Sequence, residues 1–180
     1  SLALFAAVSQ TGTNQVSTSP NGVNWTARTE AEANFWNDIA WSPSLALFAA
    51  VSSSGTNRVM TSPDGITWTA RAASEANTWL GIAWSPSLAL FAAVSSTGTN
   101  RVMTSPDGIT WTARAAAEAN SWQSIAWSPS LALFAAVSWT GTNRVMTSPD
   151  GITWTARAAS AANEWQSIAW SPSLALFTAV

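Results

Sequence analysis

The chain has 180 residues, of which 47% are apolar and 9% are charged, far below the roughly 25% charged residues of a typical globular domain. Its net charge of −2, with arginine as the sole basic residue type, offers no basic field to nucleic acid or to an anionic membrane. The absence of cysteine and histidine excludes disulfides, thiolate zinc sites and imidazole ligands. The longest apolar run, residues 45–51, is too short to span a bilayer, so we expect a soluble protein in an undetermined compartment.

A repeat of 43 residues organises the whole sequence. The run Ser-Pro-Asp-Gly-Ile-Thr-Trp at 62–68 returns at 105–111 and 148–154, with a looser copy at 19–25. Repeats of this length bury their faces only against their neighbours, and such near-identity indicates recent amplification or deliberate design. We predict a single domain, 1–180, made of four repeats and a closing strand: 1–43, 44–86, 87–129, 130–172 and 173–180.

Each repeat predicts four strands, and the third repeat serves as the model. Residues 88–94 are apolar on both faces, which indicates a strand buried on both sides. A glycine-bearing loop leads to a strand at 101–105, and a Pro-Asp-Gly turn leads to another at 109–114. The link 115–120 is too short for a stable helix, and residues 122–127 alternate between two faces as a further strand.

Four short antiparallel strands in 43 residues are typical of one blade of a β-propeller. The predicted fold class is therefore all-β: a β-propeller of four-stranded antiparallel blades, with four blades in the chain. A β-sandwich would lack the strict period, and a solenoid would have shorter repeats with fewer strands.

The Ser-x-Asp-Gly-x-Thr-Trp turn resembles the Asp-box, or BNR repeat, of sialidase-like and related β-propellers. In that family the box joins the third and fourth strands of a blade, on the side away from the usual ligand site. The resemblance implies an Asp that accepts hydrogen bonds within the turn and an aromatic residue that packs into the sheet; glycine, independently, permits positive φ. In the first repeat Asn replaces Asp and carries no charge, so we expect that blade to be held less firmly. The structural residues implied are Asn21, Trp25, Asp64, Gly65, Trp68, Asp107, Gly108, Trp111, Asp150, Gly151 and Trp154.

The sequence predicts that this chain is not an enzyme. A sialidase-like glycoside hydrolase, the catalytic alternative, is implied by the resemblance to need a Tyr nucleophile, an acid/base carboxylate and three converging arginines, and the chain has no Tyr. Its arginines recur in step on predicted rim strands, where they diverge; Arg58 and Arg71 face each other across a hairpin, with Glu75 close enough to form a surface ion pair. Asp38 beside Glu32 is interpreted as a solvated loop. We expect no catalytic, metal-binding or cofactor-binding residues.

Differences between the repeats are concentrated at one end of the predicted blades. In a propeller blade, the loop between the second and third strands lies on the same face as the link into the next blade, opposite the Asp-box turn. Exposed aromatics among polar residues suit a sugar-binding or protein-binding surface, although unconstrained loops also vary freely. The candidate ligand face comprises Gln10, Phe35, Asn37, Ser53, Thr78, Leu80, Ser96, Ser121, Gln123, Trp139, Glu164 and Gln166.

Two functions remain open: a self-assembling scaffold, structural or engineered, without a ligand, or a lectin-like propeller that binds carbohydrate or protein. The chain opens with a second strand and ends with a first strand and another second strand, which gives seventeen strands, one more than four blades require. We predict a homodimer in which two chains close one eight-bladed ring with two-fold symmetry. The alternative is a four-bladed ring of one chain, and the sequence does not say which terminal strand is used in closure.

Overall fold

The computed structural model describes residues 3–180, so the first two residues of the first predicted repeat lie outside it. The described chain is all-β, with seventeen strands, the number predicted. No helix within residues 3–180 is long and apolar enough to cross a membrane. The Ala-rich links between repeats are irregular, as expected for segments too short to hold a helix.

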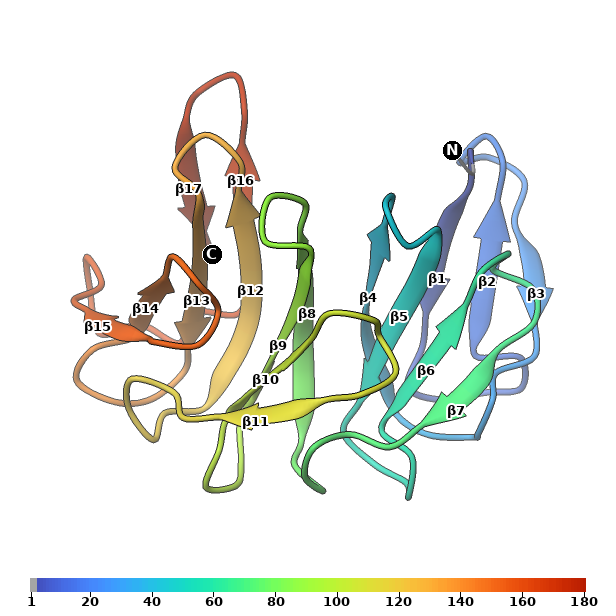
Figure 1. The fold of residues 1–180 in the computed structure, drawn as a ribbon, viewed down its shortest axis with the longest axis horizontal. Helices are drawn as coiled ribbons and strands as arrows, with labels where there is room; N and C mark the ends of the chain where they lie inside the picture. The colour runs from blue at the N-terminus through green and yellow to red at the C-terminus, as the bar shows by residue number, and fades with distance from the viewer. Residues whose placement is uncertain (1–2) are drawn as a thin grey trace.

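The strands form five antiparallel sheets in chain order (Figure 1). The first sheet has three strands and the last has two. Those terminal sheets comprise β1 (Phe5–Val8), β2 (Val16–Ser19) and β3 (Thr26–Arg28), and β16 (Ile168–Ser171) and β17 (Leu176–Ala179). The three four-stranded sheets comprise β4 (Trp36–Ser42), β5 (Leu47–Ser52), β6 (Val59–Ser62) and β7 (Thr69–Arg71); β8 (Trp79–Ser85), β9 (Leu90–Ser95), β10 (Val102–Ser105) and β11 (Thr112–Arg114); and β12 (Trp122–Ser128), β13 (Leu133–Ser138), β14 (Val145–Ser148) and β15 (Thr155–Arg157).

The sheets are arranged as an open arc rather than as a ring (Figure 1). Their first strands lie side by side along the inside, with β4 against β8, β8 against β12 and β12 against β16. The first and last sheets lie at opposite ends of the arc. One chain therefore does not close the four-bladed ring that was the alternative prediction.

A β-bulge changes the face pattern of each complete first strand. The pairing register shifts between Trp122 and Ser124, and likewise between Trp36 and Asp38 and between Trp79 and Gly81. Because a bulge inserts one unpaired residue, Trp122, Ile125 and Trp127 all reach the same buried cluster. The predicted alternation of residues 122–127 between two faces, which would place Trp122 opposite Ile125 and Trp127, is therefore wrong.

The predicted fourth strand is shorter than expected. Residues 109–111 belong to the preceding turn, and β11 begins at Thr112. The amides of Ile109 and Thr110 donate to the carboxylate of Asp107, at 2.8 Å each, so they are not available to a strand neighbour. At the start of the repeat, Ala89 has a φ of +47° and ends a turn, which delays β9 until Leu90.

Contacts between neighbouring sheets repeat with the sequence. Trp68 packs with Val16 of the preceding sheet, and Trp111 and Trp154 occupy the same place in the next two clusters. Leu47 of β5 and Leu90 of β9 also cover the turn glycines Gly108 and Gly151 of the next sheet. A Cβ built on Gly108 would lie 2.9 Å from Cδ2 of Leu47, so only glycine leaves room for that leucine.

Candidate functional site

The three Asp-Gly turns share one hydrogen-bond pattern. In the second copy, Oδ1 of Asp64 accepts from the amides of Ile66 and Thr67 at 2.8 Å, and the hydroxyl of Ser62 accepts from Gly65. Gly65 has a φ of +72°, and the indole of Trp68 donates to its carbonyl oxygen. Hydrogen bonds from the amides of Thr67 and Ile66 hold the pKa of Asp64 below its ordinary value. These carboxylates are occupied within their own turns.

The first copy makes the same turn with Asn in place of Asp. Oδ1 of Asn21 accepts from the amides of Val23 and Asn24 at 2.9 Å. However, Trp25 is 46% exposed, whereas Trp68, Trp111 and Trp154 are each 8% exposed. No earlier sheet covers Trp25 in the described chain, so its turn is formed without the packing that the other copies have.

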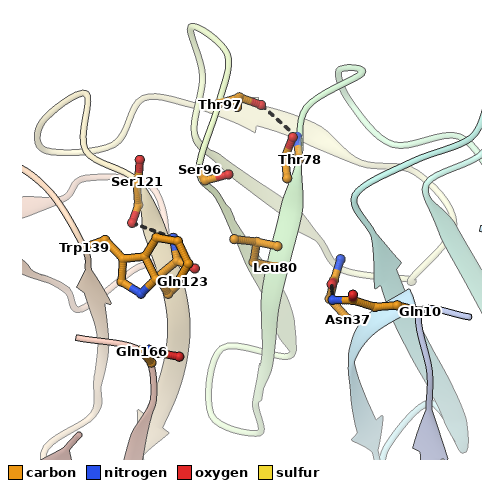
Figure 2. A pocket seen from close by; sticks show the side chains of 10 residues that line it. All are labelled: Gln10, Asn37, Thr78, Leu80, Ser96, Thr97, Ser121, Gln123, Trp139 and Gln166. Carbon is orange, nitrogen blue, oxygen red and sulfur yellow. Dashed lines mark hydrogen bonds between the residues drawn. The ribbon is translucent and has the colours of Figure 1, made fainter. Parts of the chain in front are cut away.

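A cavity of about 680 Å³ opens at the end of the arc opposite these turns (Figure 2). Strand direction alternates within each sheet, so the loops between second and third strands share this end with the links between sheets. Asn37 on β4, Leu80 on β8 and Gln123 on β12 contribute from the inner strands. The complete lining is Gln10, Asn37, Thr78, Leu80, Ser96, Thr97, Ser121, Gln123, Trp139 and Gln166.

Nine of the twelve residues of the predicted ligand face line this cavity, and Phe35, Ser53 and Glu164 do not. Phe35 is 51% exposed. Its carbonyl oxygen accepts hydrogen bonds from the side-chain amide of Asn37 and the backbone amide of Ser53, so Phe35 lies beside the cavity. Thr97 lines the cavity but was not predicted. Its counterparts are Thr or Ser, so differences between repeats gave no signal there.

The cavity wall is uncharged and mixes polar side chains with the apolar surfaces of Leu80 and Trp139. Gln10, Asn37, Gln123 and Gln166 bring carboxamides, while Trp139 is 39% exposed. Several groups already pair with one another: Nε2 of Gln10 donates to Oδ1 of Asn37 at 2.8 Å, and the backbone amide of Thr78 donates to Thr97. Donors and acceptors beside an indole suit a neutral, hydroxyl-rich ligand.

Asp38 lies on β4, half-buried, and not in the solvated loop that was predicted. Oδ2 accepts from the amide of Ile82 on β8 at 2.9 Å, and Oδ1 accepts from the amide of Ile39 at 2.8 Å. Burial raises the pKa of this carboxyl to about 6, although both hydrogen bonds oppose the shift. Asp38 therefore joins two inner strands. This role could not be predicted from the residue pattern, because the pattern does not show the β-bulge between Trp36 and Asp38.

The neighbouring acidic residues are engaged elsewhere. The side-chain amide of Asn57 donates to Glu32 at 2.5 Å, and this hydrogen bond lowers the pKa of Glu32. The carboxylate of Glu30 accepts from the backbone amide of Gln15 at 2.8 Å. The three carboxylates thus have separate partners. Within residues 3–180, no group of three or more acidic side chains is arranged to hold a metal ion.

The arginines donate to uncharged oxygen atoms rather than to acidic side chains. Arg58 donates to the carbonyl oxygens of Gly55, Ser53 and Asn77, which ties a loop to the following link. Glu75 accepts instead from the side-chain amides of Asn77 and Asn100. Arg71 donates to the hydroxyl oxygen of Thr61 at 3.2 Å. Hydrogen bonds to carbonyl and hydroxyl oxygens therefore replace the predicted surface ion pair with Glu75.

Comparisons with solved structures define the class: the chain has the fold of a β-propeller, with repeated antiparallel blades. It matches a chain of a nidogen/laminin complex (TM-score 0.72, 14% identity, 98% of this chain and 70% of that one). It also matches virginiamycin B lyase from Staphylococcus aureus (0.73, 10%, 88% and 53%) and the gluconolactonase XC5397 from Xanthomonas campestris (0.67, 12%, 92% and 61%). No family model and no curated protein matches the sequence. The chain spans about half to seven-tenths of the solved chains that it matches.

These likenesses correct the prediction that the chain is not an enzyme. Two of the proteins that share its fold are named as enzymes, a lyase and a gluconolactonase. The lack of sialidase-type residues therefore does not exclude catalysis in a propeller of this kind. At 10% and 12% identity, the likenesses establish the fold and transfer no activity to this chain.

Proposed function

We propose that the chain is a self-assembling propeller subunit, two copies of which close one eight-bladed ring. The observation that carries this proposal is the exposure of Trp25, whose three counterparts are buried by a neighbouring sheet. Each chain would supply three complete blades, and each junction would join the last sheet of one copy to the first sheet of the other. The 180-residue chain would then be one half of a single domain.

The two open ends are complementary. At the C-terminal end, Val145 and Thr147 are partly exposed. The residues at the same places in the two preceding sheets are buried: Val59, Thr61, Val102 and Thr104. Those buried positions are covered by the Trp and the glycine of the next Asp-Gly turn. Trp25 and Gly22 of the partner subunit would supply the same cover to Val145 and Thr147. A head-to-tail contact of this kind closes when the rotation permits it.

Sheet edges give a second reason for assembly. β1 ends a three-stranded sheet, and it leaves one row of backbone groups without a strand neighbour. Exposed edges of this kind favour pairing with another chain. The aligned part of this chain makes up 53% to 70% of the solved propeller chains, which supports a ring larger than one chain supplies.

Light scattering behind a sizing column tests the assembly. We expect a mass of about twice the 18.9 kDa of the chain. Trp25→Ser should lower this mass toward that of one chain, because it removes an anchor of the interface. Trp139→Ser is the matched control, since this Trp is similarly exposed but lies on the loop face. A single-chain mass for the unaltered protein would contradict the proposal.

A second candidate function is the binding of carbohydrate or of a protein through the loop face, as in a lectin. The uncharged cavity, which combines carboxamide groups with the indole of Trp139, favours a neutral sugar. Screening on a glycan array, followed by titration of any sugar that binds, would test it. Trp139→Ala should weaken such binding at least tenfold. Phe35→Ala is the control, because Phe35 is equally aromatic and more exposed but lies outside the cavity; equal losses in both variants would contradict the assignment.

We also propose that the four turns are Asp-boxes and that the repeats arose by design or recent amplification. The shared pattern of Ser, Asp and Trp hydrogen bonds in the turns supports the first statement. Near-identity of the repeats supports the second.

A further inference from the structure

The two ends of the chain carry nearly the same strand. Residues 3–8 and 175–180 differ only in that Thr178 stands where the N-terminal copy has Ala6. In the structure, β17 pairs with β16, and β1 pairs with β2. A blade has room for one second strand, so closure of the proposed ring must select one of the two copies.

The register of the complete sheets indicates where each copy would lie. Trp36, Trp79 and Trp122 lie opposite Ser52, Ser95 and Ser138 respectively. By the same register, Trp165 would lie opposite Ser9 of the partner subunit, and Trp170 opposite Phe5. In the structure, β17 (Leu176–Ala179) pairs with Ile168–Ser171 of β16, and this pairing does not extend to Trp165.

The burial of the inner Trp side chains reflects this difference. Trp36, Trp79 and Trp122 are almost fully buried, whereas Trp165 remains partly exposed beside β17. The amides of Gln166 and Ser167 both donate to the terminal carbonyl oxygen of Val180. The described pairing of β16 with β17 therefore stops short of Trp165.

Thr178 also fits the closed position less well than alanine. Its counterparts Ala49, Ala92 and Ala135 are at most 2% exposed, and Ala49 packs in the cluster between two sheets. A threonine there would bring two additional heavy atoms, one of them a hydroxyl oxygen, into a filled interface. Overpacking and the burial of an unpaired hydroxyl both destabilise such a site.

We infer that β1 of the partner subunit, and not β17, pairs with β16 in the assembled ring, and that assembly displaces residues 173–180. This inference rests on the proposed assembly. β1 is already hydrogen-bonded to β2, so when β1 pairs with β16 of the other chain, β2 and β3 follow in register. For β17 to remain on β16 in a complete blade, it would first have to displace β1 from β2. At each junction, β1, β2 and β3 of one chain thus complete a four-stranded blade with β16 of the other chain.

Truncation tests the choice of strand. We expect the chain that lacks residues 173–180 to keep the two-chain mass, and the chain that lacks residues 1–8 to lose it. If the full chain has the two-chain mass and removal of 173–180 abolishes it, the choice of β1 is wrong while the assembly proposal survives. A full chain with the mass of one copy would instead contradict the assembly itself.

Hydrogen exchange on the full chain gives an answer that does not depend on how the truncated chains fold. At a concentration where the two-chain mass is observed, the amides of residues 177–179 should exchange at least a hundredfold faster than those of the paired strand β13. Thr178→Ala should slow that exchange, because it removes the disadvantage of the C-terminal copy. Slow exchange of residues 177–179 in the unaltered assembly would overturn the inference.

Discussion

Trp25 and Trp68 occupy the same place in the same turn of two neighbouring sheets, yet one is 46% exposed and the other 8%. Both donate their indole N–H to the turn glycine, at 3.1 and 3.2 Å. Local hydrogen bonding therefore does not bury the side chain. Burial comes from the preceding sheet, which Trp68 has and Trp25 lacks in the single chain.

The same contrast holds between the inner strands of complete and incomplete sheets. Trp122 is buried between two sheets, and the last counterpart, Trp165, is not. The repeat unit thus specifies the shape of a blade, and its stability depends on neighbours on both sides. The ends of the chain are the places where this support is missing.

Removing a buried turn Trp should destabilise the chain much more than removing the exposed Trp25. Trp68→Ala should lower the free energy of unfolding by about 3–5 kcal/mol, as for other buried aromatics. Trp25→Ala should cost about 1 kcal/mol in the dilute single chain, and more as the protein concentration rises and the ring assembles. Urea denaturation at several protein concentrations measures both. Similar losses at every concentration would remove the distinction between interior and end.

The interface between β4 and β8 contains a titratable group, Asp38, which accepts a hydrogen bond from the amide of Ile82. Burial raises the pKa of Asp38 from 3.8 to about 6, so the folded chain keeps a proton that the unfolded chain has lost. The free energy of unfolding should therefore fall as pH rises from about 4 to 6, by up to about 3 kcal/mol. Asp38→Asn should remove most of this slope in denaturation curves. The variant Asp38→Ser, which copies Ser124 of the third repeat, should remove it too; a slope unchanged in both would refute this role.

Alanine substitutions at two turn glycines test the packing contact between Gly108 and Leu47. Gly108 and Gly22 have φ values of +72° and +75°, so alanine is strained at both. A Cβ on Gly108 would lie 2.9 Å from Leu47, whereas one on Gly22 would meet its nearest atom, in Phe5, at 3.7 Å. In the dilute single chain, Gly108→Ala should cost about 1–2 kcal/mol more than Gly22→Ala. Thermal unfolding of the two variants measures the difference, and equal costs would mean that the leucine moves aside freely.

The smallest expected effect concerns the charge of the turn. Asp107→Asn copies the first repeat and keeps the amide acceptor, so it should cost about 1 kcal/mol or less at pH 7. The pKa of Asp107 lies below its ordinary value because hydrogen bonds from Thr110 and Ile109 outweigh its burial. Its stabilisation is therefore present above about pH 4 and is lost as pH falls through the lowered pKa. The difference between variant and parent should disappear in that acidic range.

Sequence reasoning succeeded where one repeat contains the whole cause. The strand order, the seventeen strands and most of the cavity lining follow from patterns within 43 residues and from the alternation of strand direction. The role of Asp38 could not be predicted, because it depends on a bulge and on an amide of the next sheet. The curvature of the open arc could not be predicted from one repeat, because it is set by the angles between sheets. Thr97 was missed because it hardly varies.

The leucine that covers each turn glycine has a consequence for how such a chain can be cut or copied. Leu47 and Gly108 lie more than one repeat apart in sequence, so no single repeat holds both halves of a contact. The unit that duplicates is therefore smaller than the unit that packs. An isolated repeat would contain a leucine and a turn glycine whose packing partners lie in two different neighbouring repeats. Repeats of this kind therefore fold cooperatively only when several are joined in one chain.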